Sequence, residues 1–246
     1  MADQAQAEPA NVLLATLPAD DFTLLEPHLT PMSLNLNDVL QEQGRPVEHV
    51  YFPSGGMLSM LAILDGGDAI EIAAIGREGA VGAKLGVGPA ISFARTIVPL
   101  PGKALRISAD IFQEAVAKRV AIANLAARAN EILVANVQQA AACNALHGIE
   151  SRLARWLLHA RDRFDSDTLP LTQEFLSEML GVRRSTVTLA ARVLQGSGLV
   201  RYRRGKIQIV DRERLSATSC ECYESVRRNI ATILQAPASK LASTAG

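Results

Sequence analysis

Hydrophobic and polar positions change their spacing along this chain, and each change predicts a new kind of element. Residues 11–33 carry apolar positions at helical spacing interrupted by prolines, which predicts short helical pieces. Over residues 34–107, short runs of valine, isoleucine and aromatic residues alternate with breaks such as SGG, DGGD and PG. Regularly spaced short strands with no long helix between them are typical of a barrel or jelly roll.

Residues 109–147 lack glycine and proline and are rich in alanine, which predicts one long helix. Apolar and small positions recur there at alternating spacings of three and four: Ile122, Leu125, Ala129, Ile132, Asn136, Gln139 and Cys143. This heptad-like seam is typical of paired helices. The helix, on the order of 50 Å long at ~1.5 Å per residue, is longer than a small barrel covers. We expect it to join two chains; the alternative is that it packs on its own barrel.

The segment 171–210 has the pattern of a winged helix-turn-helix. Thr172 is the expected N-cap of a first helix, and Gly181 stands where the turn needs a residue that tolerates positive φ. A second helix is expected to begin near Arg183 or Arg184. Two runs in which apolar and polar residues alternate, LVRYRR and KIQIVD, are joined through Gly205. They predict a β-hairpin, the wing.

These patterns predict an α+β fold with four parts. Residues 1–110 form a β jelly-roll domain with N-terminal helices, and residues 111–147 form a dimerisation helix. Residues 148–215 form the winged helix-turn-helix domain, and residues 216–246 form a further helix, near residues 223–234, and a tail.

The charge distribution favours DNA as a partner of the C-terminal part. The net charge is zero, but residues 1–110 hold 6 Lys/Arg against 13 Asp/Glu, whereas residues 148–215 hold 13 against 8. Residues 182–206 contain seven Lys/Arg and no acid. Such a block suits a polyanion, although a solvated basic face is the alternative.

The outward face of the second helix has the chemistry to read a major groove. Arg184 suits a bidentate contact to guanine, Ser185 and Thr188 suit phosphates or base edges, and Leu189 suits a thymine methyl group. The basic tip of the wing suits the DNA backbone. The predicted DNA contacts are Thr172, Arg183, Arg184, Ser185, Thr186, Thr188, Leu189, Arg192, Arg201, Arg203, Arg204 and Lys206.

Composition indicates a cytoplasmic protein. The apolar content of 48% argues against extensive disorder, and no segment approaches the ~20 uninterrupted apolar residues of a membrane span. The first residues carry acids and no base, unlike a signal peptide. Three cysteines make no disulfide framework, which fits a reducing compartment.

With these motifs in place, the chain resembles the Crp/Fnr family of regulators over nearly its whole length. The resemblance rests most on LGVRRSTVTLAARVLQGSGLV, and also on GRPVEHVYFPSGGMLSML and IGREGAVG. It implies a cyclic-nucleotide-binding-like barrel and a homodimer formed through residues 110–146. It also implies a palindromic double-stranded DNA site and a contact with RNA polymerase.

Departures from the family pattern bear on the effector. Cyclic-nucleotide binders have a Gly-Glu pair and a downstream Arg-Ser or Arg-Thr, but here Ala83 follows Gly82, and the phosphate arginine falls near Ser92. Arg95 and Thr96 lie close by and complete the candidate effector pocket. We therefore expect another ligand or none, and no cofactor. Ser185 and Leu189 replace the Glu and second Arg of the catabolite-activator type, so its DNA sequence does not transfer.

Other chemistries find less support in the sequence. Cys143 stands alone on the long helix, Cys220 and Cys222 form a C-x-C motif, and the four histidines have no motif spacing, so no metal site is predicted. A thiol- or metal-responsive regulator and a cyclic-nucleotide-responsive one remain alternatives. No nucleophile elbow, P-loop or paired-histidine motif indicates an enzyme. A module whose helix-turn-helix contacts protein fits the acid-free basic block less well.

Overall fold

The N-terminal half of the chain forms an antiparallel sheet preceded by short helical pieces. In the computed structural model, which describes residues 10–83 and 90–236, these pieces are η1 (Leu14–Thr16), α1 (Ala19–Leu25) and η2 (Glu26–His28). The strands are β1 (Thr30–Leu34), β2 (Val39–Gln41), β3 (His49–Ile63), β4 (Ala69–Ile75) and β5 (Arg95–Ser108). They pair in the order β1-β5-β3-β4, and β2 also pairs with β5. The expected N-terminal β domain is confirmed.

Two strands are longer than the sequence pattern predicts. The breaks expected at SGG and PG lie inside β3 and β5, so the expectation of separate short strands is wrong there. The register between β3 and β5 shifts at Gly55 and Met57, and the glycines therefore form bulges instead of turns. Glycine is needed because a Cβ on Gly102 would collide with the Gly55 carbonyl oxygen.

The long helix expected over residues 111–147 is divided in two. α2 (Ala109–Lys118) and α3 (Val120–Leu146) meet at Arg119, whose φ of −134° and ψ of 114° lie outside the helical region. Its Nε lies 2.6 Å from a carboxylate oxygen of Asp21 on α1, so an ion pair holds this residue at the break. The 27 residues of α3 span about 40 Å at ~1.5 Å per residue.

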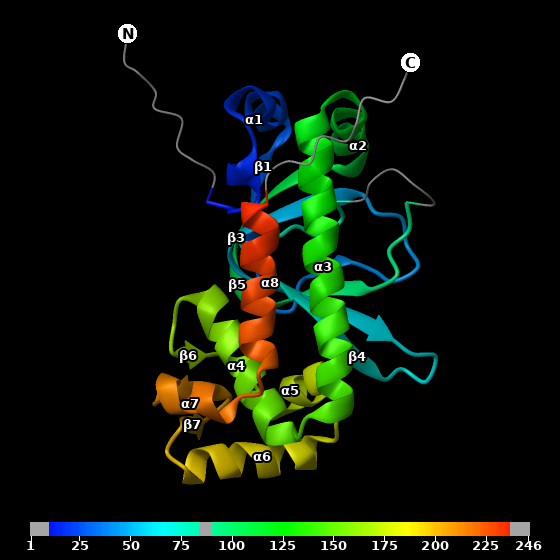
Figure 1. Cartoon of the computed structure of the whole chain (residues 1–246). Helices are drawn as coiled ribbons and strands as arrows, with labels where there is room; N and C mark the ends of the chain where they lie inside the picture. Colours follow the sequence, from blue (N-terminus) through cyan, green and yellow to red (C-terminus); the bar gives the residue numbers. More distant parts are fainter. Residues whose placement is uncertain (1–9, 84–89, 237–246) are drawn as a thin grey trace.

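The seam that the sequence assigns to a second chain faces the chain itself. Except for Gln139, which is half-buried, its members are buried within the single chain: Ile122, Leu125, Ala129, Ile132, Asn136 and Cys143. Sheet residues share the cores that contain Ile122, Leu125, Ala129 and Ile132, whereas Cys143 clusters with Cys220 and Cys222. α8 (Cys222–Gln235) runs antiparallel beside α3 (Figure 1). The seam prediction is wrong because alternating spacing marks a buried face without saying what covers it. Packing on the chain's own barrel, the alternative, is what the structure shows.

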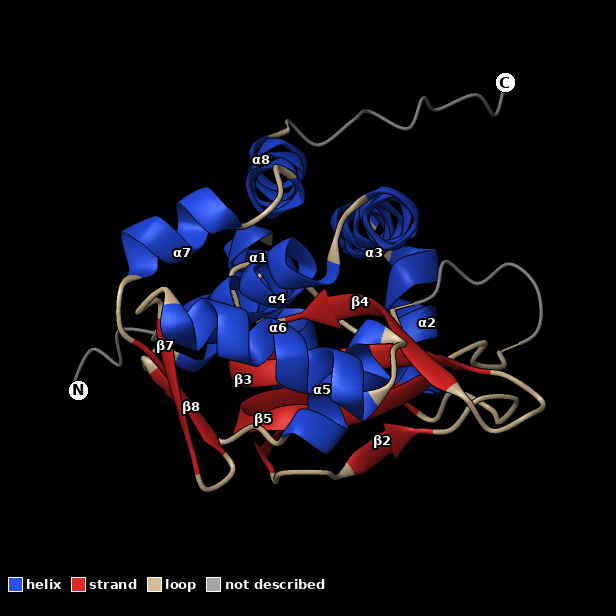
Figure 2. Ribbon diagram, turned by 90° about the horizontal axis from the view of Figure 1, so that it is seen from below, coloured by secondary structure: helices blue, strands red, loops and turns tan. Residues whose placement is uncertain are grey.

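The C-terminal domain is a winged helix-turn-helix, as the sequence predicts. Its elements are α4 (Ile149–Phe164), β6 (Thr168–Leu169), α5 (Gln173–Leu180), α6 (Arg184–Gly196), β7 (Val200–Arg203) and β8 (Lys206–Ile209). The strands form a sheet in the order β6-β8-β7. α6 lies at the lower end of the molecule in Figure 1, and Figure 2 looks onto that end.

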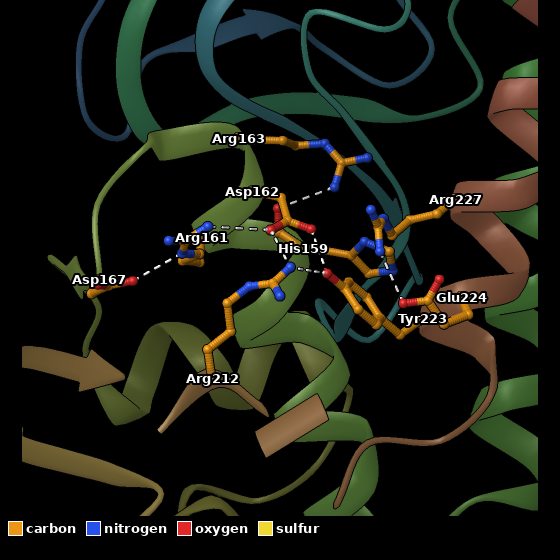
Figure 3. Close-up of polar contacts among 9 residues, drawn as sticks. All are labelled: His159, Arg161, Asp162, Arg163, Asp167, Arg212, Tyr223, Glu224 and Arg227. Atoms are coloured by element: carbon orange, nitrogen blue, oxygen red, sulfur yellow. Dashed lines mark hydrogen bonds and ion pairs between the residues drawn. The ribbon is translucent and has the colours of Figure 1, made fainter. Parts of the chain in front are cut away.

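Two helices follow the wing. α7 (Arg212–Thr218) is not predicted by the sequence pattern, whereas α8 confirms the helix expected near residues 223–234. Polar contacts hold α8 against α4 (Figure 3): the Tyr223 hydroxyl donates to Asp162 at 2.6 Å and accepts from Arg212 at 3.0 Å. The expected tail, residues 237–246, lies outside the described residues.

One hydrophobic core joins the sheet domain to the C-terminal domain. Met57 and Leu100 of the sheet pack in the same cluster as Leu157 of α4 and Val187 of α6. Trp156 of α4 also donates a hydrogen bond to the buried Glu71 of β4 at 2.9 Å. The two domains are therefore packed together and not merely tethered. Within residues 10–83 and 90–236, the helices are too short or too polar to cross a bilayer.

Candidate nucleic-acid interface

The turn between α5 and α6 requires glycine. Thr172 caps α5, because its Oγ1 accepts a hydrogen bond from the backbone N–H of Phe175 at 3.1 Å. α5 ends at Gly181, whose φ of 61° favours glycine. A Cβ at this position would also approach the Ile70 side chain of β4 at 2.6 Å. This turn fixes the start of α6 and packs on the sheet domain.

α6 buries one face in the domain and exposes a basic one. Val187, Ala190, Ala191 and Leu194 are buried. Ser185, Leu189 and Arg192, at spacings of four and three, are exposed on the opposite face. Leu189 is 61% exposed, which places a large apolar side chain in solvent at the middle of the helix. Arg183, the N-cap, and Arg184, the first helical residue, are exposed at its start.

Besides Thr172, the cap of α5, two of the expected DNA contacts already have partners within the domain. Arg184 Nη1 lies 3.5 Å from the Glu174 carboxylate, but both side chains are more than half exposed. Such a pair contributes ~0–1 kcal/mol, so the guanidinium is easily redirected to a base. The Thr188 hydroxyl lies 2.8 Å from Gln173 Oε1 and 3.0 Å from the Arg184 carbonyl oxygen. Thr188 is half-buried, as is Thr186, so both are less available than Arg184.

The wing presents a concentrated positive charge. Arg204 and Gly205, with φ of 49° and 75°, form the two-residue turn between β7 and β8. Arg203 and Lys206 face each other directly across the strands, an arrangement that costs stability unless an anion neutralises it. The residues around a hollow of about 410 Å³ are Thr168, Arg201, Arg203, Arg204, Lys206 and Gln208. The structure thus gathers all four expected basic wing residues.

Two side chains that the sequence analysis missed position the wing. The backbone N–H of Gln173, in the first turn of α5, donates to the Tyr202 hydroxyl at 3.1 Å. The Gln195 side-chain oxygen accepts from the Tyr202 backbone N–H at 2.9 Å. The Thr172 methyl group lies 3.8 Å from where a Cβ on Gly205 would stand, so the wing tip adjoins the α5 cap. α5, α6 and the wing therefore form one surface.

The sheet domain contains a cavity of about 540 Å³ against α3. Of the expected effector residues, Gly82, Ala83 and Ser92 line it. Arg95 is instead paired with Glu42 at 2.8 Å, and Thr96 is fully buried in β5, so the structure does not place either in the cavity. Apolar side chains dominate the lining, and none of its described residues carries a charge. The cavity suits an apolar ligand better than a phosphate.

A cluster of thiols and one imidazole lies away from the basic surface. The Sγ atoms of Cys143, Cys220 and Cys222 and a ring nitrogen of His147 all lie within 4.8 Å of one another. The hydrogen bond with Cys220 lowers the pKa of Cys143, with help from the charge of Arg155. The same bond, together with burial, raises the pKa of Cys220. The spacing of Cys143 and His147, one turn apart on a helix, is the signal that the sequence analysis missed.

Comparison with known proteins agrees with this geometry. Residues 151–218 match the family model described as the Crp-like helix-turn-helix domain. The chain carries a Crp-like helix-turn-helix. The whole described architecture, with its N-terminal sheet domain, long helix and winged C-terminal domain, is the Crp/Fnr regulator fold.

Solved structures of Crp/Fnr regulators share this fold at low sequence identity. FixK2 from Bradyrhizobium japonicum is 17% identical, with a TM-score of 0.66, over 78% of this chain and 98% of that one. CLP from Xanthomonas campestris, a c-di-GMP-responsive global regulator, is 15% identical, with a TM-score of 0.64, over 78% and 99%. A Crp/Fnr-family regulator from Thermus thermophilus is 19% identical, with a TM-score of 0.62, over 77% and 98%. No curated protein sequence matches the chain.

Proposed function

We propose that this chain is a DNA-binding transcription regulator that acts as a homodimer on a palindromic site, and that it is not an enzyme. The observation that carries the proposal is the basic surface of α6 and the wing. Arg183, Arg184 and Arg192 are exposed on α6, the wing adds four more basic residues, and residues 182–206 contain no acid. Seven positive charges on a winged helix-turn-helix, with only the exposed Arg184–Glu174 pair to offset them among the contacts described above, match a DNA backbone.

In the proposed complex, α6 enters the major groove and the wing lies along the phosphates. Arg184 reads guanine, and Leu189 contacts a thymine methyl group. The wing arginines position the domain and read no sequence. The positive end of the α6 dipole adds attraction for a phosphate, and no acid in its first turn opposes it.

We propose that two chains pair through the face of α3 that the barrel and α8 leave open. A second set of α3 residues, different from the buried seam, also recurs at alternating spacings of three and four: Ala127, Asn130, Val134, Val137 and Ala141. Val134 is 51% exposed, and the others are half-buried or exposed. Asn130 and Val137 also line the cavity, so a ligand there would bear on the pairing face. Two-fold pairing explains a palindromic DNA site.

Sedimentation of a Val134→Glu variant tests the pairing face. A charge buried between two helices opposes their association, so we expect a monomer where the parent chain is a dimer. Ala142→Glu, on an exposed α3 position outside this second set, is the matched control and is expected to remain dimeric. A dimeric Val134→Glu protein would rule out this face.

Selection of bound duplexes from a random pool, with the purified chain, tests the DNA-binding function. We expect a palindromic motif with half-sites about one helical turn apart. Affinity for that motif is expected to fall steeply with added salt, as counterion release requires. Failure to enrich any sequence, both alone and with cell extract present, would contradict the proposal.

We propose that any ligand of the cavity is apolar and not a cyclic nucleotide. The lining described above offers Gln41, Ser92 and Asn130 as polar side chains amid apolar ones. Calorimetric titration with cyclic AMP, cyclic GMP and, because CLP responds to it, c-di-GMP tests this. Micromolar binding of any of them in the cavity would overturn the proposal.

We propose that the chain also contacts RNA polymerase and that it acts in the cytoplasm. Transcription in vitro from a promoter carrying the selected site, with and without the chain, tests the first. We expect a change in transcript yield that depends on the site. An unchanged yield together with tight DNA binding would leave a DNA-binding protein that does not regulate initiation.

A further inference from the structure

The C-terminal end of α3 and the segment before α8 bring together all three cysteines of the chain. Cys143 lies in the last turn of α3, and His147 is the residue that ends this helix. Cys220 and Cys222 flank the start of α8. The three cysteines are buried in a small cluster of their own, separate from the larger hydrophobic cores. Packing in those cores therefore does not account for them.

We propose that these four side chains bind a single zinc ion. Three thiolates and one imidazole are a ligand set that zinc commonly takes in structural sites. Bonds of about 2.3 Å to sulfur in a tetrahedron put two sulfur atoms about 3.8 Å apart. The Cys143 and Cys220 sulfur atoms are 3.5 Å apart, and Cys222 Sγ is 3.5 Å from His147 Nδ1. In the zinc geometry the Cys143–Cys220 distance would open by a few tenths of an ångström, and separations as wide as 4.8 Å would close by about 1 Å.

The surroundings of the four ligands complete the site. Nδ1 of His147 faces Cys222, while its Nε2 lies 3.3 Å from the carboxylate of Glu221. With Nδ1 on the metal, Nε2–H donates to that carboxylate, which is the arrangement that orients metal-bound histidines. Gln139 Nε2 donates to Cys222 Sγ at 3.0 Å, a contact that stabilises a thiolate. Each outer contact thus acts on a proposed ligand.

The spacing argues against the other chemistries open to these thiols. In an iron–sulfur cluster the four ligands are divided between at least two iron atoms, so ligand atoms on different irons stand further apart than the 4.8 Å that encloses these four. A disulfide between Cys143 and Cys220 would give no role to His147 or Cys222. Four donors around one point, all from this chain, leave no open coordination position, so we assign a structural and not a catalytic role.

The site lies where the two domains are joined. His147 directly precedes Gly148, the N-cap of α4, and Cys222 directly precedes Tyr223, which binds Asp162 of α4 (Figure 3). The ion would link the end of α3 to the start of α8, which then returns along α3 (Figure 1). Zinc would thereby fix the DNA-binding domain relative to α3.

Metal analysis of the full-length protein, purified with a thiol reductant under anaerobic conditions, tests the site. We expect about one zinc per chain, the stoichiometry of a closed four-ligand site. Cys222→Ser and His147→Gln are expected to lose most of it. His28→Gln, a histidine remote from the cluster, is the matched control and keeps the metal. Replacement by Co²⁺ is expected to give the intense visible absorption of tetrahedral thiolate coordination.

A measurement on the parent chain covers the case in which these variants fail to fold. After chelation, adding Zn²⁺ is expected to raise Tm and to protect all three thiols from a thiol reagent. Absence of zinc with neither effect would overturn the proposal, as would a Cys143–Cys220 disulfide in the reduced preparation or iron with acid-labile sulfide. Because none of these readouts uses DNA, failure of the zinc site is distinguishable from failure of the proposed DNA-binding function.

Discussion

The indole N–H of Trp156 donates a 2.9 Å hydrogen bond to the carboxylate of Glu71, which joins α4 of the C-terminal domain to β4 of the sheet domain. The Ser59 hydroxyl binds the other carboxylate oxygen. Glu71 is buried, and burial raises its pKa above the ordinary value of 4.5 in spite of these hydrogen bonds. The contact between the two domains therefore contains a carboxyl group that resists ionisation.

This relationship makes the stability of the chain depend on pH. Because the folded pKa is higher than the unfolded one, the folded state holds the proton more tightly. The stabilisation is present below the unfolded pKa and is lost as pH rises through the folded pKa. Glu71→Gln keeps an oxygen that accepts from Trp156 and cannot ionise. We expect its free energy of unfolding to rise relative to the parent chain as pH increases above the ordinary glutamate value of 4.5.

Urea denaturation across this pH range measures the difference. Glu71→Ala is the control that removes the acceptor, and the unpaired indole N–H is expected to cost about 1–3 kcal/mol relative to Glu71→Gln at every pH, because neither variant titrates at this position. A constant difference between the Gln variant and the parent chain would show that Glu71 does not titrate in this range.

Arg184→Ala is expected to relax sequence discrimination. Loss of a bidentate contact to guanine costs about 1–3 kcal/mol at that base pair and little at others. Affinities for the selected site and for its single-base variants measure the effect. Arg45→Ala, an exposed arginine on the sheet domain, is the control and is expected to leave them unchanged. An unaltered preference in the Arg184 variant would place the recognition face elsewhere on α6.

Arg203→Ala and Arg204→Ala are expected to weaken binding to all duplexes alike. Each removes a positive charge from the wing, and a phosphate contact carries no sequence information. The slope of log affinity against log salt concentration is expected to become shallower by about 1 for each arginine removed from a phosphate. A change in the preferred sequence with an unchanged salt slope would assign these arginines to base readout.

Local patterns explain how much of this molecule could be predicted from its sequence. The cap at Thr172, the glycine at position 181 and the hairpin at Gly205 each act within a few residues, and the structure contains all three. The basic residues of α6 and the wing followed from the same segment. The residue pattern also indicated the fold class, because the spacing of apolar residues within a short window distinguishes strands from amphipathic helices.

The errors concern contacts between residues distant in sequence. The periodicity of α3 identified the buried face, but whether Ile132 meets the chain's own sheet or a second chain depends on tertiary packing. Cys143 and Cys220 are 77 residues apart, and nothing local to either indicates that α8 returns along α3. The cavity residues were partly found, since Gly82 and Ser92 line it, whereas Arg95 pairs with Glu42.

Tyr223→Phe is expected to loosen α8 from α4. The Tyr223 hydroxyl donates to the charged Asp162 at 2.6 Å and accepts from Arg212. Burial raises the pKa of Tyr223 to about 12, so the hydroxyl keeps its proton at neutral pH and remains a donor. Loss of a hydrogen bond to a charged partner costs about 1.5–3 kcal/mol. Tyr51→Phe is the matched control, because that hydroxyl donates only to the neutral Leu40 carbonyl, at 3.2 Å, and its loss costs about 0.5–1.5 kcal/mol. Equal decreases of unfolding free energy in the two variants would mean that the Asp162 contact adds nothing to the anchoring of α8.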